Sequence, residues 1–329
     1  MSLRATRSWR VLVKYLSTQI LVSPVKLLDK GLLLVQETKL QIIIPLEKIS
    51  SPVLTKMENK DVLRVLKETS RTFYLPIVRL PSRLQEAVSS AYLCMRALDE
   101  IEDHAELDNK NKSCLLREIS SVIQANIAVG DISAELHSRI FSKYLNILPE
   151  VSLRIGEWLS FAPAGIGPRI WEATASMAER MAYWAERDWE ISTEADLNEY
   201  TFSVAGAVGL LICDIWAWFD GTQLDRASAI HFGRGLQSVN ILRNREEDLG
   251  RKVDFYPKGW THKEVLAYAR RHVARARREI TPIPQLAFAY LVEIPLTLAE
   301  ATLDAIESGR TKLSRQQVLQ IMAQIKSVT

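Results

Sequence analysis

The chain has 329 residues, of which 47% are hydrophobic and 25% are charged, and its formal net charge is +3. This composition supplies ample apolar residues for a large core, and a charge so near balance does not point to nucleic acid as a partner. The 13 glycines and 12 prolines argue against an all-β fold, and three cysteines without paired spacing argue against a disulfide framework or a zinc site.

Residues 1–58 are predicted to form an N-terminal arm outside the compact domain. Residues 1–28 contain Arg and Lys but no acidic residue. They fit a basic amphipathic helix in peripheral contact with an anionic membrane, a transit peptide, or a start without fixed structure. Residues 40–45, Leu-Gln-Ile-Ile-Ile-Pro, are predicted as a short strand or an extended linker. A cytoplasmic location, at the membrane periphery if residues 1–28 bind lipid, is expected.

From residue 59 onward, apolar residues recur at helical spacing, which predicts a single all-α domain over residues 59–329. The apolar run 204–219 carries Asp214 near its middle, so it is predicted to be a buried helix rather than a membrane span. The predicted helices cover residues 59–69, 83–104, 111–129, 133–147, 167–192, 196–220, 223–250, 261–279, 284–308 and 314–327.

The first polar constellation lies near the end of the predicted helix 83–104. Asp99, Glu102 and Asp103 stand at i, i+3 and i+4, so they share one helix face. Three carboxylates at this spacing repel one another and require a counter-charge. Mg²⁺ is the usual choice when a phosphate shares the site, and we predict these three residues as metal ligands. Arg96 lies one turn upstream on nearly the same face.

A second polar face lies on the predicted helix 223–250. At about 100° per residue, five polar residues fall within one arc of about 100°: Gln237, Asn240, Asn244, Glu247 and Asp248. Asn240, Asn244 and Asp248 form an i, i+4, i+8 ladder of oxygen donors, which suits a hard cation, and Arg243 borders the arc within reach of a phosphate. The two faces are predicted to be opposite walls of one cavity that clamps a polyphosphate through Mg²⁺, with an apolar and aromatic remainder for a hydrocarbon chain.

Four ordered segments resemble the squalene and phytoene synthases, which join two prenyl diphosphates head to head. The resemblance covers roughly residues 60–325. It implies an all-α isoprenoid-synthase bundle around a central apolar cavity, a prenyl diphosphate substrate such as farnesyl or geranylgeranyl diphosphate, Mg²⁺, and NADPH only for chemistry of the squalene synthase type. The segments are Ser70-Arg-Thr-Phe73, then Tyr92-Leu-Cys-Met-Arg-Ala-Leu-Asp-Glu-Ile-Glu-Asp103, then Tyr200-Thr-Phe-Ser-Val-Ala-Gly-Ala-Val-Gly209, and Leu236-Gln-Ser-Val-Asn-Ile-Leu-Arg-Asn-Arg-Glu-Glu-Asp248 with Asp254-Phe-Tyr-Pro257 and the helix Lys312 to Ile321.

The resemblance also assigns roles residue by residue. Diphosphate contacts fall on Ser70, Arg71 and Arg96, with Arg243 added from its place on the second face. The catalytic positions are Tyr92 and Arg96 at the first ionisation site, together with Ser203 and Gln237, and the metal ligands are Asp99, Glu102, Asp103, Asn240, Asn244 and Asp248.

Two positions depart from the family pattern. Asn244 stands where the family's second acidic signature begins with Asp, which removes one negative charge from the metal site. An Asn-led triad at the same spacing resembles that of class I terpene cyclases, so the oxygen ladder is kept. Ser203 stands where the family has a catalytic tyrosine, which removes a phenol. Both departures fall where the second half of a head-to-head reaction is run.

Three functional hypotheses remain open at this point. The first is a head-to-head synthase of the squalene or phytoene type. The second is a terpene synthase or prenyl diphosphate hydrolase that ionises one prenyl diphosphate and gives a cyclic terpene or an alcohol. The third is a non-catalytic helical protein that binds a prenyl chain or another subunit. The oligomeric state is left open.

Overall fold

The computed structural model describes residues 59–126, 131–279 and 286–310, short stretches between 312 and 321, and three strands between 26 and 45. Contacts between Cα atoms divide the chain into two units, Met1–Lys56 and Met57–Thr329. The arm and the domain predicted from the sequence meet close to this division.

The described part of the first unit is a three-stranded antiparallel sheet. Its strands are β1 (Lys26–Leu28), β2 (Leu32–Glu37) and β3 (Leu40–Pro45), in the order β1-β2-β3. In the register of the second pair, Leu33 lies opposite Ile44. β-branched residues favour strands, and of the two predictions for residues 40–45 the strand is the correct one. Residues 1–25 lie outside the described part of the chain, so the three interpretations of residues 1–28 stay predictions.

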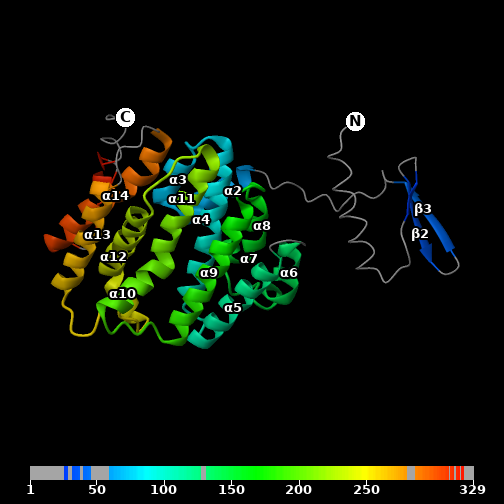
Figure 1. Ribbon diagram of the computed structural model, residues 1–329. Coiled ribbons are helices and arrows are strands. Elements are labelled where there is room, and N and C mark those ends of the chain that lie inside the picture. Colours follow the sequence, from blue (N-terminus) through cyan, green and yellow to red (C-terminus); the bar gives the residue numbers. More distant parts are fainter. Residues whose placement is uncertain are drawn as a thin grey trace. The chain divides into compact units, whose positions relative to one another are not determined.

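The second unit is a helical bundle (Figure 1). This confirms the all-α fold predicted for the domain. Its elements are α2 (Asn59–Thr69), α3 (Arg71–Ile77), α4 (Ser82–Glu102), α5 (Asn109–Asn126), α6 (Ile132–Arg139), η2 (Phe141–Lys143), α7 (Glu150–Leu153), α8 (Ile155–Phe161), α9 (Gly167–Glu186), α10 (Glu194–Thr201), η3 (Phe202–Gly206), α11 (Ala207–Asp220), α12 (Arg226–Gly250), α13 (His262–Glu279) and α14 (Leu286–Glu307).

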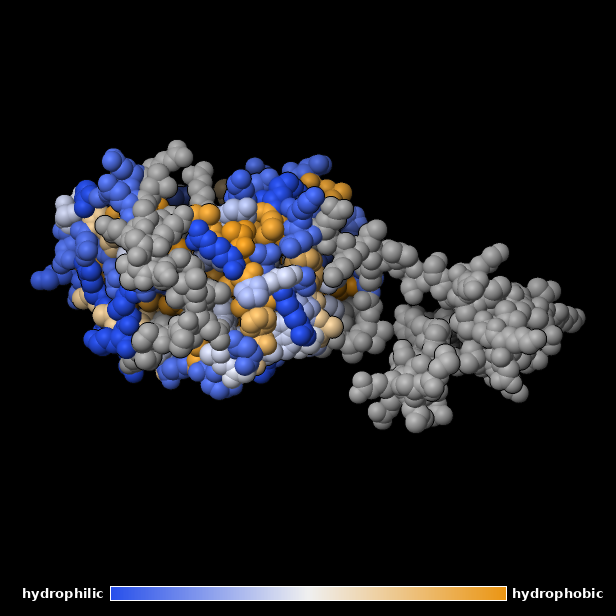
Figure 2. Space-filling view, turned by 90° about the horizontal axis from the view of Figure 1, so that it is seen from above, coloured by the Kyte–Doolittle hydropathy of each residue, from blue (hydrophilic) through white to orange (hydrophobic). Residues whose placement is uncertain are grey.

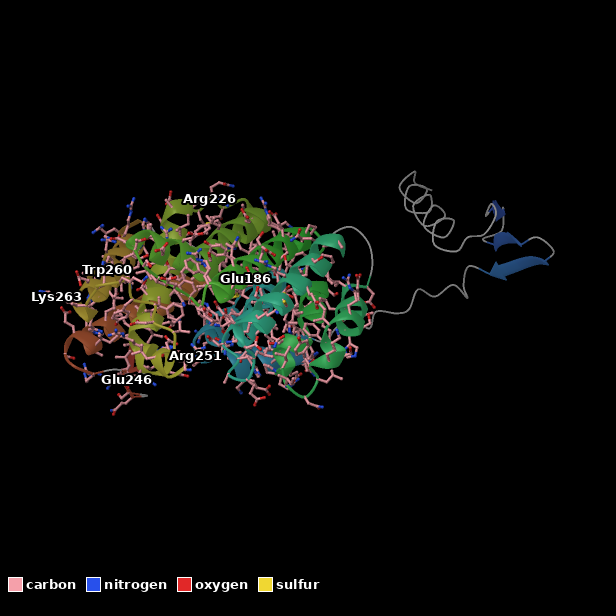
Figure 3. All side chains as sticks on the ribbon, turned by 90° about the horizontal axis from the view of Figure 1, so that it is seen from below. Glu186, Arg226, Glu246, Arg251, Trp260 and Lys263 are labelled. Carbon is pink, nitrogen blue, oxygen red and sulfur yellow. The ribbon has the colours of Figure 1, made fainter. Side chains whose placement is uncertain are left out.

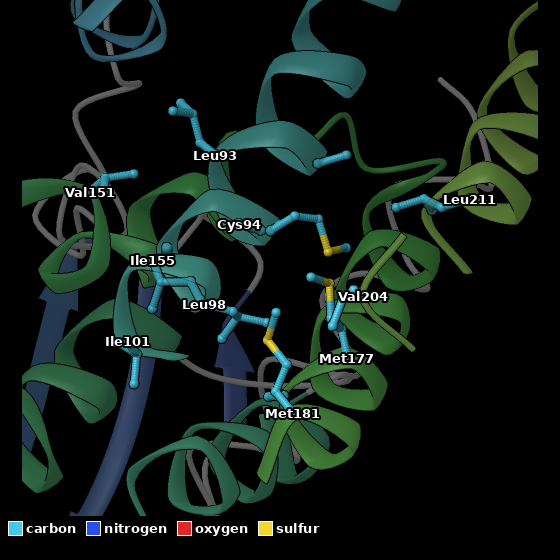
Figure 4. Close-up of a cluster of buried hydrophobic side chains, with 14 of the residues drawn as sticks. Leu93, Cys94, Leu98, Ile101, Val151, Ile155, Met177, Met181, Val204 and Leu211 are labelled. Atoms are coloured by element: carbon cyan, nitrogen blue, oxygen red, sulfur yellow. The ribbon is translucent and has the colours of Figure 1, made fainter. Parts of the chain in front are cut away.

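Helix α4 forms the centre of the bundle, in contact with α2, α3, α5, α7, α8, α9 and α11. Side chains that leave α4 in different directions are therefore buried, and Leu93, Leu98 and Ile101 are fully enclosed. Figure 4 shows this cluster, in which α4 packs against Ile155 of α8 and Met181 of α9. Burial of such apolar side chains stabilises the fold by about 1.5 to 3 kcal/mol each.

The structure corrects several predicted boundaries. The predicted helix 133–147 ends at residue 139, and the predicted helix 196–220 contains a π-helix, η3, between α10 and α11. The short helices α3, α7 and α8 were not predicted because four to seven residues carry too little periodicity. Most of the predicted last helix, 314–327, lies outside the described residues.

The segment Glu194–Asp220, which spans α10, η3 and α11, is long and apolar enough to cross a membrane by length and composition. Its apolar side chains have contacts within the domain. Leu211 and Ile215 are buried in the core, and Val204, Val208 and Ile212 line a central cavity. Viewed from above, the face of the domain shows apolar residues in the middle of a largely hydrophilic surface (Figure 2).

Two glycines let η3 and α11 approach α12 backbone to backbone. A Cβ atom on Gly209 would lie 2.2 Å from the carbonyl oxygen of Ala229, and one on Gly233 would lie 2.3 Å from that of Ala205. Real Cβ atoms essentially never come this close to backbone, so any larger residue requires the helices to move apart. Both glycines also border the central cavity.

A pair of histidines joins α12 to α13. The Nδ1 atoms of His231 and His272 are 2.7 Å apart. Burial lowers the pKa of His272 to about 3, and the charges of His231 and of nearby arginines act in the same direction. Because the unfolded chain binds this proton near pH 6.5, we expect the free energy of unfolding to fall as the pH drops from about 6.5 toward 3, by at most about 1.4 kcal/mol per pH unit.

Urea unfolding of wild type and His272→Gln across this pH range measures the effect. The variant is expected to have a shallower pH dependence than the wild type. His137→Gln is the matched control because His137 is exposed on α6. Equal slopes in wild type and His272→Gln would contradict the assignment.

Candidate active site

A cavity of about 460 Å³ lies between α4 and α12. Ser228 and Asn240 of α12 both line it, and their 12-residue separation on a helix spans about 18 Å. Arg96 and Asp99 of α4 lie on its wall, as do Gln237 and Asn240 of α12. The central cavity expected from the sequence is therefore present, and its apolar and aromatic lining includes Phe73, Ile77, Val88, Met95, Met177, Val204, Val208, Ile212, Leu224, Phe232 and Leu236.

The α4 wall carries Tyr92, Arg96 and Asp99, which recur at i, i+4 and i+7 and so share the cavity face. The Arg96 guanidinium pairs with Glu100 and lies 4.0 Å from Asp99. Burial raises the pKa of Asp99 to about 7, although Arg96 acts against the shift. The 37% of the Asp99 side chain that remains accessible opens into the cavity. This carboxylate is therefore partly enclosed by the protein and still accessible to a ligand.

Glu102 does not join Asp99 at the cavity wall. Its carboxylate accepts a hydrogen bond of 2.9 Å from Nε1 of Trp189, and the side chain is buried. Burial raises the pKa of Glu102 to about 8. Trp189 has a φ of 50°, a left-handed conformation that is rare for a bulky residue. The structure therefore does not bring the Glu102 carboxylate to the cavity wall beside Asp99, where the sequence predicted it.

The α12 wall presents amides rather than carboxylates. Gln237 and Asn240 line the cavity. Arg243 donates to the side-chain oxygens of Asn240 and Asn244, each at 3.1 Å. The predicted oxygen ladder thus begins at the cavity, and its first two amides share one guanidinium.

Arg251 links the two walls, a residue that the sequence reasoning did not select. Its Nη1 atom lies 2.6 Å from Oδ1 of Asp103, which caps α4, and its Nη2 atom lies 2.5 Å from Oδ1 of Asp248 on α12. Asp248 is buried, and burial raises its pKa while Arg251 opposes the shift. Viewed from below, Arg251 lies where the yellow end of α12 meets the cyan helices (Figure 3). The C-terminal ends of α4 and α12 therefore meet at one place.

The remaining predicted residues lie near the cavity or outside the described side chains. Ser70 is buried at the N-cap of α3, where it accepts from the Phe73 amide at 2.9 Å and contacts the Tyr92 hydroxyl. The side chain of Arg71 is outside the described part of the structure. Ser203 is buried in η3, its hydroxyl donates to the Glu199 carbonyl at 2.8 Å, and it is not among the cavity-lining residues.

The donor set suits Mg²⁺ held jointly with a phosphate rather than by the protein alone. Asp99, Gln237 and Asn240 bring carboxylate and amide oxygens to one cavity, and Mg²⁺ prefers oxygen ligands. Among the described residues, no three His, Cys, Asp or Glu side chains form a group that could hold a metal ion. Mg²⁺ is usually bound by one or two carboxylates, substrate phosphates and water, and the residues present fit that arrangement.

The fold and the cavity define an all-α protein with a cavity that charged, amide, apolar and aromatic side chains line together. The sequence comparison then gives the family. The chain belongs to the squalene/phytoene synthase family, whose model matches residues 66–265.

Similar proteins agree with this assignment. A squalene synthase of Schizosaccharomyces pombe is 31% identical over 204 residues, which cover 59% of this chain and 43% of the relative. A squalene synthase of Eremothecium gossypii is 32% identical over 215 residues, with 62% and 47% covered. The chain thus spans less than half the length of these curated relatives. The structure of TcSQS with the ligand BPH1237 shares the fold, with a TM-score of 0.60 at 22% identity over 80% of this chain and 84% of that one.

Proposed function

We propose that the protein condenses two prenyl diphosphates, farnesyl or geranylgeranyl, head to head in a Mg²⁺-dependent reaction. One observation carries the proposal in a chain of this family. Asp99 and Arg96 of α4 and Gln237 and Asn240 of α12 line a single cavity. Its remaining walls are mostly apolar and aromatic, with Gln223, Asp225 and Ser228 as further polar lining residues.

Polar residues of the cavity act on the diphosphate head of the substrate, and aromatic residues act on its hydrocarbon chain. The allylic carbon–oxygen bond of one chain breaks, and its electron pair leaves with the diphosphate. The alkene of the second chain then supplies the electrons for the new carbon–carbon bond. Loss of a proton from the joined cation closes the ring of a cyclopropylcarbinyl diphosphate, which keeps the second diphosphate. Bound Mg²⁺ supplies charge neutralisation to the leaving diphosphate. Arg96 and Arg243 would donate to the diphosphate oxygens, and the Asp99 carboxylate would hold the Mg²⁺. The rings of Phe73, Tyr92 and Phe232 line the wall, where their π faces stabilise a carbocation and exclude water.

A second function is favoured by Ser203. The hydroxyl is engaged with Glu199, so η3 offers the cavity no phenol at this position. Together with Asn244, this supports a terpene synthase or hydrolase that ionises one prenyl diphosphate and releases a cyclic terpene or an alcohol. In that case NADPH has no part in the reaction.

Purified protein incubated with farnesyl or geranylgeranyl diphosphate and Mg²⁺, with and without NADPH, separates these functions. Mass spectrometry of a C30 or C40 hydrocarbon supports condensation, and dependence of a C30 product on NADPH shows reduction of the squalene type. A C15 or C20 alcohol or cyclic hydrocarbon supports the second function. No turnover of either substrate under any of these conditions would refute both and leave a binding role.

A further inference from the structure

The two signature helices, α4 and α12, carry the two polar sequence motifs, and their C-terminal ends meet at a place that requires a positive charge. Each helix ends there, and a helix C-terminus carries a partial negative charge of about half an elementary charge. Asp103 caps α4 and Asp248 lies in the last turn of α12, so both add a full negative charge to an end that already disfavours it. A cation between two such ends offsets their repulsion.

Arg251 supplies that cation from within the chain. The guanidinium makes one contact to each carboxylate, at 2.6 Å to Asp103 and 2.5 Å to Asp248, and Nη1 also lies 3.3 Å from the Asp103 carbonyl. Only 29% of the Arg251 side chain is accessible to solvent. A planar guanidinium that bridges two carboxylates in a partly buried place is a stronger partner than a surface ion pair.

The backbone around Arg251 fixes its position. The Arg251 amide donates to the Asp248 carbonyl at 2.9 Å, so the residue closes α12. Lys252 follows with a φ of 64°, a left-handed conformation that turns the chain, and the Val253 amide returns to the same Asp248 carbonyl at 3.0 Å. This turn holds the guanidinium between the two helix ends rather than leaving it on a flexible tail.

Other charges at the meeting point fit a site with a resident cation. Asn244 lacks the charge of a carboxylate, and its amide oxygen accepts from Arg243. An uncharged amide at this position reduces the positive charge that must come from solution.

We propose that Arg251 permanently takes the place of one divalent cation between Asp103 and Asp248, so that this protein binds a diphosphate with one metal ion fewer than its two signature helices have positions for. The inference rests on the diphosphate site of the proposed function. It makes Arg251 a positioning residue, which fixes the two walls and the number of ions, and leaves Asp99 as the carboxylate that meets exchangeable metal.

The test counts metal ions without turnover. Wild type and Arg251→Gln are equilibrated by dialysis with Mn²⁺ and inorganic pyrophosphate, and the bound Mn²⁺ is measured per chain. We expect Arg251→Gln to bind one more Mn²⁺ than wild type, because Asp103 and Asp248 then accept a metal ion. Arg251→Lys keeps the positive charge and is expected to match the wild-type number.

Arg245→Gln is the matched control. Arg245 lies on α12, which Arg251 caps, but it pairs with Asp254 at 3.0 Å and does not line the cavity, so its loss should leave the count unchanged. If Arg251→Gln does not fold, as judged by circular dichroism, Arg251→Met keeps the apolar stem and removes the charge.

Equal Mn²⁺ numbers in wild type and the charge-free variant would overturn the inference, even if the variant binds more tightly, because Arg251 would then compete with metal rather than replace it. Absence of Mn²⁺ binding in both proteins would overturn it as well. An extra ion in the variant, combined with no turnover of any prenyl diphosphate by wild type, would refute the proposed function and leave this inference standing.

Discussion

Replacement of Asp99 by Asn is expected to lower turnover of prenyl diphosphates by about 10³-fold, which corresponds to about 4 kcal/mol of transition-state stabilisation. Asp99 is the carboxylate of the first signature that lines the cavity, whereas Glu102 binds Trp189 and Asp103 binds Arg251. No neighbouring carboxylate therefore replaces it. Asn keeps the size and one oxygen, so the loss reports charge rather than packing.

Steady-state kinetics with a saturating prenyl diphosphate and a Mg²⁺ titration measure the effect. Glu86→Gln is the matched control, because Glu86 lies on the same helix but is not part of the cavity lining. Turnover of Asp99→Asn within tenfold of wild type would show that the cavity-facing carboxylate has no part in ionisation.

Replacement of Val208 by Trp is expected to lower kcat/KM for prenyl diphosphates by about 10²-fold, or about 3 kcal/mol. Val208 lies on α11 and lines the apolar part of the cavity. An indole there fills space that the hydrocarbon chain requires. Because the polar wall formed by Asp99 and Asn240 is left intact, binding of Mn²⁺ and inorganic pyrophosphate should change by less than about twofold, within the usual effect of a distant substitution.

Dialysis and kinetics on the same preparation separate the two effects. Leu210→Trp serves as control, since Leu210 lies on the same helix outside the cavity lining. Loss of pyrophosphate binding in Val208→Trp would mean that head and tail do not occupy separate parts of the cavity. Unchanged kcat/KM would mean that the hydrocarbon chain lies elsewhere.

The sequence was sufficient for the helices that carry the site, because α4 and α12 are long segments, of 21 and 25 residues, without an internal proline. Their pattern also placed Arg96, Asp99, Gln237 and Asn240 on faces that the structure brings to one cavity. Spacing predicts which residues share a face of one helix, and that part of the reasoning needs no tertiary information.

Helical spacing could not predict which contacts the side chains of Glu102 and Asp103 make, because each contact depends on a partner distant in the chain. Trp189 draws Glu102 into the core, and Arg251 holds Asp103 across 148 positions. Arg251 did carry a local signal, since it stands three residues after Asp248, a spacing at which an acid and a base pair near a helix end. The contact of Arg251 with Asp103 had no local signal in the sequence.

The glycine contacts that η3 and α11 make with α12 bear on how this scaffold changes its ligand range during evolution. At Gly209 and Gly233 the cavity boundary is backbone, and a Cβ atom at either position collides with a neighbouring carbonyl. Substitutions at these two glycines therefore threaten folding before they reshape the interior. Laboratory selection for longer or shorter substrates should instead accumulate changes on the opposite flank, at positions such as Val88 and Met95, where side chains set the available width.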